Sequence, residues 1–345
     1  MINKQSHRKD EHVSLAIKFY NDNSNAGFDQ IRFIHQGVPE ISVSDVDYST
    51  SFDGINMNVP FYIEAMTGGS SYTKKLNEKL ARIAKKTGLA MATGSQSVAL
   101  KDSSESSSFE IVRNTNPDGI IFSNIGSSVD PTNAQKAIEM MNSDALEVHI
   151  NTPQELIMPE GDRDFYWLDN IKNIVNAIDK PVIVKEVGFG MAKETIAKLT
   201  DIGVKNINIS GNGGTNFARI ENYRRKHQEL SYLDNWGQST VESLFEAYAF
   251  SDDVNILASG GIRTPLDIVK SLSLGAKAVG MAAPILYSLI KNGEDATVEM
   301  IEEYKNGIKV IMTMLGARNI SDLKKQKLIL SSDLLAYLKQ RGITY

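Results

Sequence analysis

The chain has 345 residues, 41% of them hydrophobic and 23% charged, which suits one large α/β barrel with added elements or two smaller domains. Its formal net charge of −5 gives no support to nucleic-acid binding, and the absence of cysteine excludes a thiol nucleophile, thiolate metal ligands and disulfides. Because no apolar run reaches membrane-spanning length and residues 1–10 lack the apolar core of a signal peptide, we expect a cytoplasmic protein without membrane contact.

An N-terminal extension, residues 1–58, precedes the regular part of the chain. Its pattern predicts a helix over Asp10–Phe19 and a β-hairpin that turns at Asp53-Gly54. We expect the remainder, residues 59–345, to form one barrel with C-terminal helices.

The charged run from His7 to His12 has two interpretations. Such a run usually marks a solvated helix start with local ion pairs. The alternative is a diphosphate clamp, in which Arg8 binds oxygens in a fork and Lys9 adds a point charge. Spacing alone favours neither interpretation.

Short apolar segments alternate with amphipathic helical patterns from residue 59 onward. Eight of these segments have the length and composition of buried strands. Uninterrupted alternation indicates a parallel sheet, and the number eight favours a closed (β/α)8 TIM barrel over an open doubly wound sheet. The predicted strands are Pro60–Ala65, Leu89–Ala92, Gly119–Ser123, Leu146–Ile150, Val182–Lys185, Asn206–Ile209, Asn255–Ala258 and Ala278–Met281.

Three segments interrupt the regular pattern. Ser103–Ser108 is low in complexity and predicts a solvated loop that ends in helix-capping serines. Gly211–Gly237 is a long loop after the sixth strand, and because it follows the carboxyl end of that strand we expect a lid. Ser321–Leu338 predicts an amphipathic surface helix.

The ends of the last two predicted strands suit a phosphate. Gly260-Gly261 allows close approach of the backbone to an anion, and the next helix begins with Thr264 as cap and Pro265 in its first turn, with Asp267 three residues after the cap. A helix start after such a turn presents free N–H groups. In TIM barrels the loops after strands seven and eight commonly bind phosphate.

Small polar residues and glycines follow the other strands, which suits a planar, hydrogen-bonding cofactor that carries a phosphate. Thr67 or Asn124 alone indicates no more than a turn. Lys185 is different, because it ends a buried strand where an unpaired ammonium is costly. It should meet an anionic partner or carry a shifted pKa, although such lysines are structural about as often as functional.

The segment after the fourth strand is the most specific. His149 and Asn151 face the same side of an extended chain, and Gln154 and Glu155 follow. Histidine and glutamine bind small substrates or relay protons, and a single glutamate holds Mg²⁺ well only when substrate phosphates add further oxygens. The alternative is a hydrogen-bonded core histidine and a solvated glutamate.

Eight motifs, in their order along nearly the whole chain, resemble the type 2 isopentenyl-diphosphate isomerases, a family of FMN-dependent barrel enzymes. Each motif alone is weak, whereas the ordered set is specific. The motifs are Arg8–His12, Met66–Gly69, Gly94–Gln96, Ser123–Gly126, His149–Glu155, Lys185–Gly190, Ser210–Thr215 and Ser259–Arg263.

The resemblance implies a role for each matching residue. Those implied to contact FMN are Ala65, Met66, Thr67, Ser95, Asn124, Lys185, Ser210 and Thr215, with Gly261, Ile262, Arg263, Ala282 and Ala283 at its phosphate. Those implied to contact the substrate are Arg8, Lys9, Ser95, His149, Asn151 and Gln154. Gln154, His149 and Lys185 are implied to be catalytic, and Glu155 to be the Mg²⁺ ligand.

The implied reaction is the reversible 1,3-allylic rearrangement of isopentenyl diphosphate to dimethylallyl diphosphate in isoprenoid biosynthesis. The resemblance also implies that reduced FMN is the acid–base catalyst, that NADPH only primes it, and that the protein is a homotetramer or homo-octamer. One residue departs from the family pattern: Ser97 stands where many members have an arginine that helps to bind the diphosphate.

Two other functions compete with this one. The FMN-dependent 2-hydroxy-acid oxidases share the barrel and the strand-five lysine, but they have a His-Gly-Ala-Arg run after strand six, where this chain has Ser210–Thr215 without histidine or arginine. A non-catalytic barrel that binds a phosphate ligand would give no reason for His149, Gln154 and Glu155 to cluster.

Overall fold

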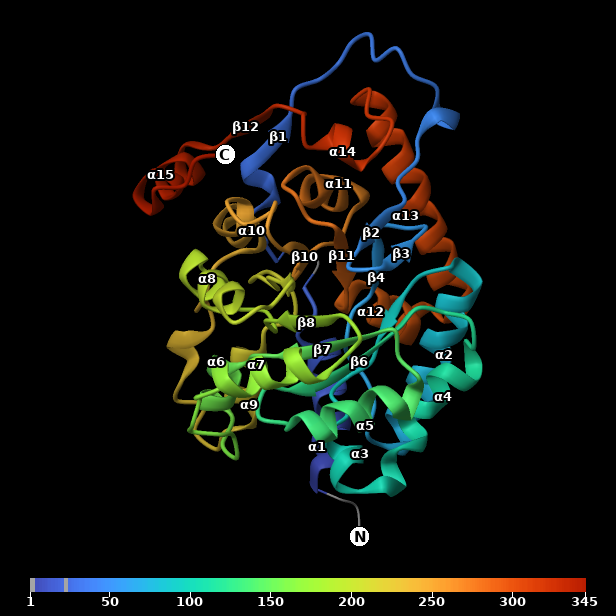
Figure 1. Cartoon of the computed structure of the whole chain (residues 1–345), viewed down its shortest axis with the longest axis vertical. Coiled ribbons are helices and arrows are strands. Elements are labelled where there is room, and N and C mark those ends of the chain that lie inside the picture. Colours follow the sequence, from blue (N-terminus) through green and yellow to red (C-terminus); the bar gives the residue numbers. More distant parts are fainter. Residues whose placement is uncertain (1–3, 22–23) are drawn as a thin grey trace.

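The computed structural model describes residues 4–21 and 24–345, and its centre is a closed barrel of eight parallel strands (Figure 1). Each predicted strand overlaps one barrel strand, which confirms the (β/α)8 fold and excludes the open sheet. The strands are β4 (Phe61–Ile63), β5 (Met91–Ala92), β6 (Ile121–Gly126), β7 (Ala145–His149), β8 (Val182–Lys185), β9 (Asn206–Asn208), β10 (Asn255–Ser259) and β11 (Ala278–Met281).

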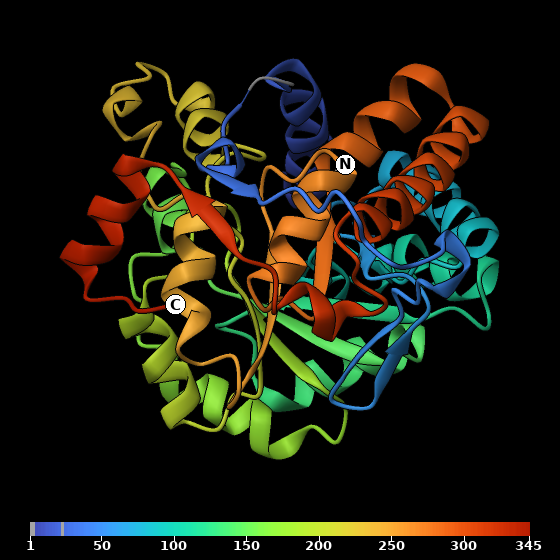
Figure 2. The ribbon, with the colours of Figure 1, turned by 90° about the horizontal axis from the view of Figure 1, so that it is seen from above.

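Helices follow the strands and surround the barrel (Figures 1 and 2). Buried apolar side chains of the helices and strands pack between the two and form the largest hydrophobic cluster of the described chain. The helices are α2 (Ser71–Thr87), α3 (Ser97–Lys101), α4 (Ser107–Thr115), α5 (Pro131–Met141), α6 (Thr152–Ile157), α7 (Leu168–Ala177), α8 (Lys193–Asp201), α9 (Phe217–Arg224), α10 (Thr240–Tyr248), α11 (Pro265–Ser273), α12 (Ala283–Asn292) and α13 (Glu294–Met314).

A second core layer fills the amino-terminal end of the barrel. The predicted hairpin, β2 (Thr50–Phe52) and β3 (Ile55–Met57), turns at Asp53-Gly54 with positive φ at both residues, as a tight hairpin requires. Its apolar side chains pack on the first residues of the barrel strands, where Phe52 meets Phe122 edge to face. The hairpin therefore closes this end and leaves the opposite end for a site.

The rest of the extension reaches the other parts of the fold. Helix α1 (Lys4–Lys18) begins before the predicted Asp10 and stands beside α2, α9 and α12, as Figure 2 shows from above. Strand β1 (Ile31–Phe33) pairs with a strand near the C-terminus. The short 3-10 helices η1 (Phe28–Gln30) and η2 (Val43–Asp45) complete the extension. The domain boundary at residue 58 stays a prediction.

The predicted surface helix Ser321–Leu338 is wrong as one continuous helix, although both of its ends are helical. The chain forms α14 (Ile320–Leu323), then β12 (Leu328–Leu330), which pairs antiparallel with β1, and finally α15 (Ser332–Arg341). Ser331 caps α15 by accepting from the backbone N–H of Leu334 (3.1 Å). Pairing with a distant strand outweighs the local helical pattern because it satisfies the edge of β1.

The predicted loop Ser103–Ser108 is also mostly wrong, since it forms the 3-10 helix η3 (Ser103–Glu105) and the start of α4. Ser108 is buried and accepts from the backbone N–H of Gly69 (2.8 Å). The long segment Gly211–Gly237 contains α9 and the 3-10 helix η4 (Ser231–Leu233), and its role as a lid stays a prediction. Among the described helices, none has the length and apolarity that crossing a membrane requires.

Candidate active site

A cavity of about 430 Å³ lies at the carboxyl ends of the barrel strands. The residues that sequence analysis assigned to cofactor, substrate and metal meet there, with one exception. Those that line the cavity are Arg8, Lys9, Ala65, Met66, Ser95, Asn124, His149, Asn151, Gln154, Glu155, Lys185, Ser210, Thr215, Gly261, Ile262, Arg263, Ala282 and Ala283.

The exception is Thr67, whose side chain does not line the cavity. It is buried and donates its hydroxyl proton to Asn77 on α2. Its carbonyl accepts from the backbone N–H of Gly94 (2.8 Å). Thr67 therefore joins β4, α2 and the loop after β5, and its predicted place beside a flavin stays a prediction.

Strand β8 brings Lys185 into the cavity, and it is almost fully buried. Its ammonium donates to the carbonyl of Glu186 (2.9 Å) and lies 3.9 Å from Glu64 Oε1. Glu64 is fixed in turn by donors from Tyr62 (3.1 Å) and Asn208 (2.7 Å). The anionic partner that burial of Lys185 requires is therefore Glu64.

The turn after β10 is a close backbone junction. Gly260 and Gly261 have φ of 95° and 68°. A Cβ on Gly260 would lie 2.0 Å from the carbonyl oxygen of Gly211, and one on Gly261 would lie 2.6 Å from backbone atoms of Gly213. The loops after β9 and β10 therefore lie backbone against backbone, which only glycine permits at these positions.

The helix starts beside this junction have the predicted form. Thr264 and Asp267 make a capping box at α11, with Pro265 at the first position. Helix α12 begins at Ala283, on the wall of the cavity, and the first N–H groups of any helix have no partner within it. A glycine turn beside a helix start fits the phosphate group of FMN.

Arg263 has a structural role that the sequence did not predict. Its guanidinium donates to the carbonyls of Ser24 (3.1 Å), Gly261 (2.8 Å), Asn21 (3.2 Å) and Gly213 (2.8 Å). These bonds fasten the N-terminal extension to the loops after β9 and β10. A direct contact between Arg263 and a phosphate stays a prediction.

Helix α1 contributes two cations on the opposite side. Arg8 lies 3.8 Å from Glu160, and the ammonium of Lys9 donates to the carbonyl of Ser95 (3.4 Å). Loss of solvent and the neighbouring Arg8 lower the pKa of Lys9 to about 8. Ser97 also faces this side, with its hydroxyl 3.1 Å from that of Ser95.

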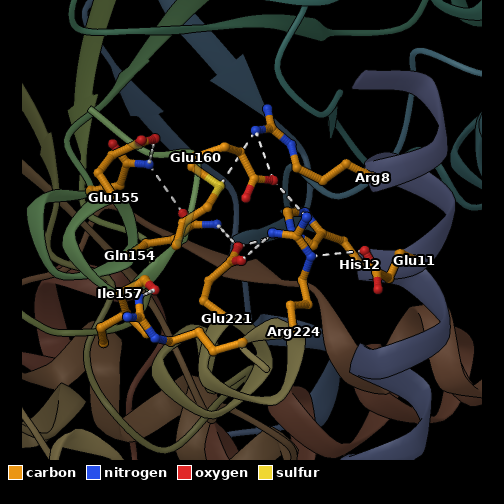
Figure 3. A network of polar contacts seen from close by, with 12 residues as sticks. Arg8, Glu11, His12, Gln154, Glu155, Ile157, Glu160, Glu221 and Arg224 are labelled. Atoms are coloured by element: carbon orange, nitrogen blue, oxygen red, sulfur yellow. Dashed lines mark hydrogen bonds and ion pairs between the residues drawn. The ribbon is translucent and has the colours of Figure 1, made fainter. Parts of the chain in front are cut away.

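Gln154 is held by a carboxylate that the sequence did not single out (Figure 3). Its amide donates to Glu221 Oε1 (3.2 Å), which also lies 2.9 Å from His12 Nε2. The second oxygen of Glu221 accepts from Arg224 (2.6 Å). Burial would raise the pKa of Glu221, but these donors hold it below its usual value.

Arg224 is the centre of the surrounding network in Figure 3. Besides Glu221, its guanidinium pairs with Glu11 on α1 (2.8 Å) and with Glu160 after α6 (2.6 Å). One side chain of α9 therefore joins three segments at the edge of the cavity. Because Glu160 also approaches Arg8, the network reaches the predicted diphosphate clamp.

Glu155 lies at the start of α6 with both oxygens in use. Oε1 accepts from Asn151 (3.0 Å), and Oε2 accepts from the backbone N–H of Asp162 (2.8 Å). No cluster of three or more metal-binding side chains occurs within residues 4–21 and 24–345. Glu155 alone would therefore need substrate oxygens to complete a metal site, as the sequence predicted.

His149 stands above a buried polar group inside the barrel. Its Nδ1 lies 3.0 Å from Asn124 Oδ1, and the Asn124 amide donates to Glu147 (2.9 Å). Loss of solvent, with the charges of Lys185 and Lys9, lowers the pKa of His149 to about 3. The imidazole is therefore neutral.

Four charged residues that line the cavity or hold its side chains were not predicted from the sequence: Glu64, Glu147, Glu221 and Arg224. Glu64 and Glu147 interrupt otherwise apolar strands, which is a signal that was available. Glu221 and Arg224 lie within the segment predicted as a long loop after the sixth strand, and no sequence pattern there indicates which side chains face the cavity.

The chain resembles known proteins throughout its length. Residues 123–330 match the FMN-dependent dehydrogenase family. The chain is 56% identical to the isopentenyl-diphosphate delta-isomerase of Latilactobacillus sakei subsp. sakei (strain 23K) over 340 residues, which cover 99% of this chain and 97% of the relative. It is 50% identical to the enzyme of the same name from Staphylococcus haemolyticus (strain JCSC1435) over 341 residues, which cover 99% and 97%.

Two solved structures share the fold at low identity. A flavocytochrome b2 mutant with pyruvate bound matches with a TM-score of 0.69 and 19% identity, over 97% of this chain and 85% of that one. A mandelate oxidase mutant with an FMN adduct matches with a TM-score of 0.65 and 17% identity, over 93% and 92%. The extent and identity of the sequence matches decide the assignment: the chain belongs to the isopentenyl-diphosphate delta-isomerase family, within the wider group of FMN-dependent dehydrogenases.

Proposed function

We propose that the chain converts isopentenyl diphosphate reversibly to dimethylallyl diphosphate with FMN as its cofactor. One observation carries the proposal: a single cavity has a glycine turn and a helix start suited to a phosphate on one side, and Arg8, Lys9 and Glu155 on the other. A site with two separate places for phosphate groups suits a phosphorylated cofactor beside a diphosphate substrate.

The barrel side would hold FMN. Backbone N–H groups near Gly261 and at the start of α12 would bind its phosphate, and small residues such as Ala65 and Ser210 leave room for a flat ring. When bound and reduced, FMN supplies an acid–base group for the reaction. Lys185, positioned by Glu64, would stabilise negative charge on the reduced ring.

The α1 side would hold the diphosphate. Arg8 and Lys9 supply positive charge, and Glu155 would share an Mg²⁺ ion with the diphosphate oxygens. Ser97 leaves this side without the arginine that many family members have, so Lys9 has a larger share of the neutralisation. Binding the distant diphosphate holds the alkene in place during the reaction.

The rearrangement adds one proton to the terminal alkene carbon and removes one from the allylic C2, so no net oxidation occurs. The amide of Gln154, held by Glu221 and Asn151, would position the reacting alkene or move a proton. His149 is neutral and adds no positive charge beside a cation-like transition state. The enclosing cavity limits the access of water to that state.

Further features belong to this proposal. NADPH would reduce the flavin before turnover and would not be consumed by it. The protein would work in the cytoplasm as a homotetramer or homo-octamer, without nucleic-acid or membrane partners. The domain division, at residue 58, would place the clamp on the extension and the flavin in the barrel.

Oxidation of a 2-hydroxy acid is the competing function, because the solved structures with this fold include such oxidases. The loop Ser210–Thr215 has neither a histidine base nor an arginine for a substrate carboxylate. A non-catalytic phosphate-binding barrel would leave the ordering of Gln154 by Glu221 without purpose. The geometry therefore favours the isomerase.

The test begins with the purified protein and its visible spectrum. We expect a flavin spectrum that NADPH bleaches, followed by formation of dimethylallyl diphosphate with Mg²⁺ and no net use of NADPH. Gln154→Ala should retain FMN and lose most turnover, and Glu155→Ala should lose the dependence on Mg²⁺. Glu110→Ala, at an exposed position on α4, is the matched control and should behave as the unchanged protein. A chemically reduced, FMN-loaded protein that leaves isopentenyl diphosphate unchanged would refute the proposal.

A further inference from the structure

We propose that Glu147 acts through Asn124 to hold His149 in the tautomer that carries its proton on Nδ1, so that Nε2 presents a lone pair to the cavity. Glu147 and Asn124 are positioning residues in this scheme. The inference deepens the proposed function and rests on it for its kinetic consequence, whereas the tautomer itself can be measured without turnover.

The register of two neighbouring strands brings the three side chains together. Asn124 on β6 pairs with Glu147 on β7, and Gly126 pairs with His149 two positions later. Residues two apart on a strand share a face, so all three polar side chains point into the barrel. A Cβ on Gly126 would lie 3.3 Å from His149 Nε2, so glycine leaves room for the ring at the cavity wall.

The amide of Asn124 determines which imidazole nitrogen carries the proton. Its Nδ2 donates to Glu147 Oε2 (2.9 Å), which leaves Oδ1 facing His149 Nδ1 (3.0 Å). An amide oxygen only accepts, so His149 Nδ1 must donate. The backbone N–H of Asn124 is held by Gln96 (3.1 Å), which keeps the residue in place.

This orientation requires that Glu147 Oε2 accepts and does not donate. Both carboxyl groups of the barrel interior, Glu64 and Glu147, are buried, and Lys185 is the ammonium beside them. Glu147 Oε1 has no hydrogen-bond partner within the described part of the chain. Burial and repulsion from Glu64 raise the pKa of Glu147 well above its usual value.

A proton on Oε1 resolves both facts. It removes the charge of that oxygen, and the neighbouring Glu64 carboxylate can accept the new O–H, so a hydrogen bond replaces the repulsion between the two groups. Oε2 then remains the acceptor for Asn124. The opposite placement, with the proton on Oε2, would turn the Asn124 amide around and move the histidine proton to Nε2.

The consequence is a hydrogen-bond acceptor at the cavity, on an imidazole that loss of solvent, with the charges of Lys185 and Lys9, keeps neutral. An acceptor binds a ligand that brings an N–H or O–H group. An ionised prenyl diphosphate brings neither, whereas a reduced nitrogen heterocycle does. His149 would therefore contact an N–H of the reduced cofactor or an ordered water, and not the substrate as the family resemblance implies.

The tautomer can be measured by NMR of the FMN-loaded protein labelled with ¹⁵N in its five histidines, with His149→Gln to identify the signal. We expect His149 Nδ1 to be protonated and Nε2 unprotonated at neutral pH. A protonated Nε2 in the unchanged protein would overturn the proposal, whatever the activity of the preparation.

Two variants separate positioning from charge. Glu147→Gln keeps an acceptor for Asn124, so it should keep the original tautomer, and its kcat should fall less than that of a variant without the acceptor. The side chain of Glu147→Met has a similar length and shape but no oxygen to accept from Asn124. This variant should therefore populate both tautomers and lose at least about 10-fold in kcat at little changed KM. If Glu147→Met does not fold, Glu147→Leu takes its place in the experiment. An acceptor-free variant with the original tautomer would overturn the role of Glu147.

Discussion

Lys9 loses its positive charge when the pH rises slightly above neutrality, because burial and the neighbouring Arg8 lower its pKa to about 8. The ammonium form, present below that pKa, attracts the diphosphate, and the neutral amine above it does not. We therefore expect KM for isopentenyl diphosphate to rise as pH increases through about 8, with little change in kcat. Initial rates measured between about pH 6.5 and 9.5 give both constants.

Two arginine variants make this pH prediction specific. Lys9→Arg keeps its charge throughout the range and should have a KM that no longer rises. Lys75→Arg, at an exposed position on α2, should retain the original profile. If KM of the unchanged enzyme stays constant across the range, Lys9 does not contribute its charge to binding in the way proposed.

Glu221 is buried, accepts from Gln154 and Arg224 and lies 2.9 Å from His12 Nε2, so removal of its charge affects both order and stability. In Glu221→Gln one oxygen is replaced by an amide that cannot accept, so either Gln154 or Arg224 loses its partner. We expect kcat to fall by about 10-fold or more while FMN remains bound, and stability to fall by about 1–3 kcal/mol. Steady-state kinetics, flavin absorbance and urea unfolding measure these effects. Unchanged kcat would show that the orientation of Gln154 does not depend on Glu221.

At the scale of elements, the sequence predicts those helices and strands that a local pattern of apolar residues determines. The eight barrel strands could be found because each is a short apolar segment between helical patterns. Strand β12 could not, because Leu328–Leu330 is a strand only through its pairing with Ile31–Phe33, almost 300 residues earlier.

The same distinction applies to the site. Residues at the carboxyl ends of strands, such as His149 and Lys185, could be assigned from the barrel architecture alone. Glu147 lies two residues before a strand end, and its partner Asn124 belongs to another strand, so their contact depends on register. Glu221 depends on how α9 packs, which a long loop does not reveal.

The hairpin β2–β3 offers a test of how the closed end of the barrel supports the fold. Phe52 is 3% exposed and packs on Phe122 at the start of the barrel interior. Phe52→Ala should lower the free energy of unfolding by about 3–5 kcal/mol, because it leaves a cavity that neighbouring strands cannot fill. Urea unfolding measures the loss. Ser51→Ala, on the exposed face of the same strand, should change it by less than about 0.5 kcal/mol; equal losses would mean that the hairpin is not a structural plug.

At the scale of the whole molecule, the cavity joins the N-terminal extension to the last two strands of the barrel. Helix α1 forms one wall, and the loops after β10 and β11 form another, while Arg263 ties the extension to those loops. A cofactor that contacts these parts stabilises the folded state by mass action. With free FMN at about 100 times its Kd, the increment is about 2.7 kcal/mol, so the loaded protein should unfold at a higher temperature than the stripped protein.

We expect the stabilisation by FMN to depend on Gly260, and substitution of Gly203 is the matched control. Both have a positive φ, 95° and 92°, so alanine costs each about 1–2 kcal/mol of backbone strain. A Cβ at Gly203 would meet nothing within 4 Å, whereas one at Gly260 would lie 2.0 Å from the carbonyl oxygen of Gly211. Gly260→Ala must therefore separate the loops after β9 and β10 and distort the phosphate site.

The two variants should differ in their response to FMN and not only in stability. Gly203→Ala should unfold at a lower temperature but gain the same increment from added FMN as the unchanged protein. Gly260→Ala should lose most of that increment and retain little flavin after gel filtration. Thermal unfolding with and without FMN, followed by circular dichroism, distinguishes them. If FMN stabilises both variants equally, the cofactor phosphate does not bind at the Gly260-Gly261 turn. This follows because only Gly260→Ala distorts that turn.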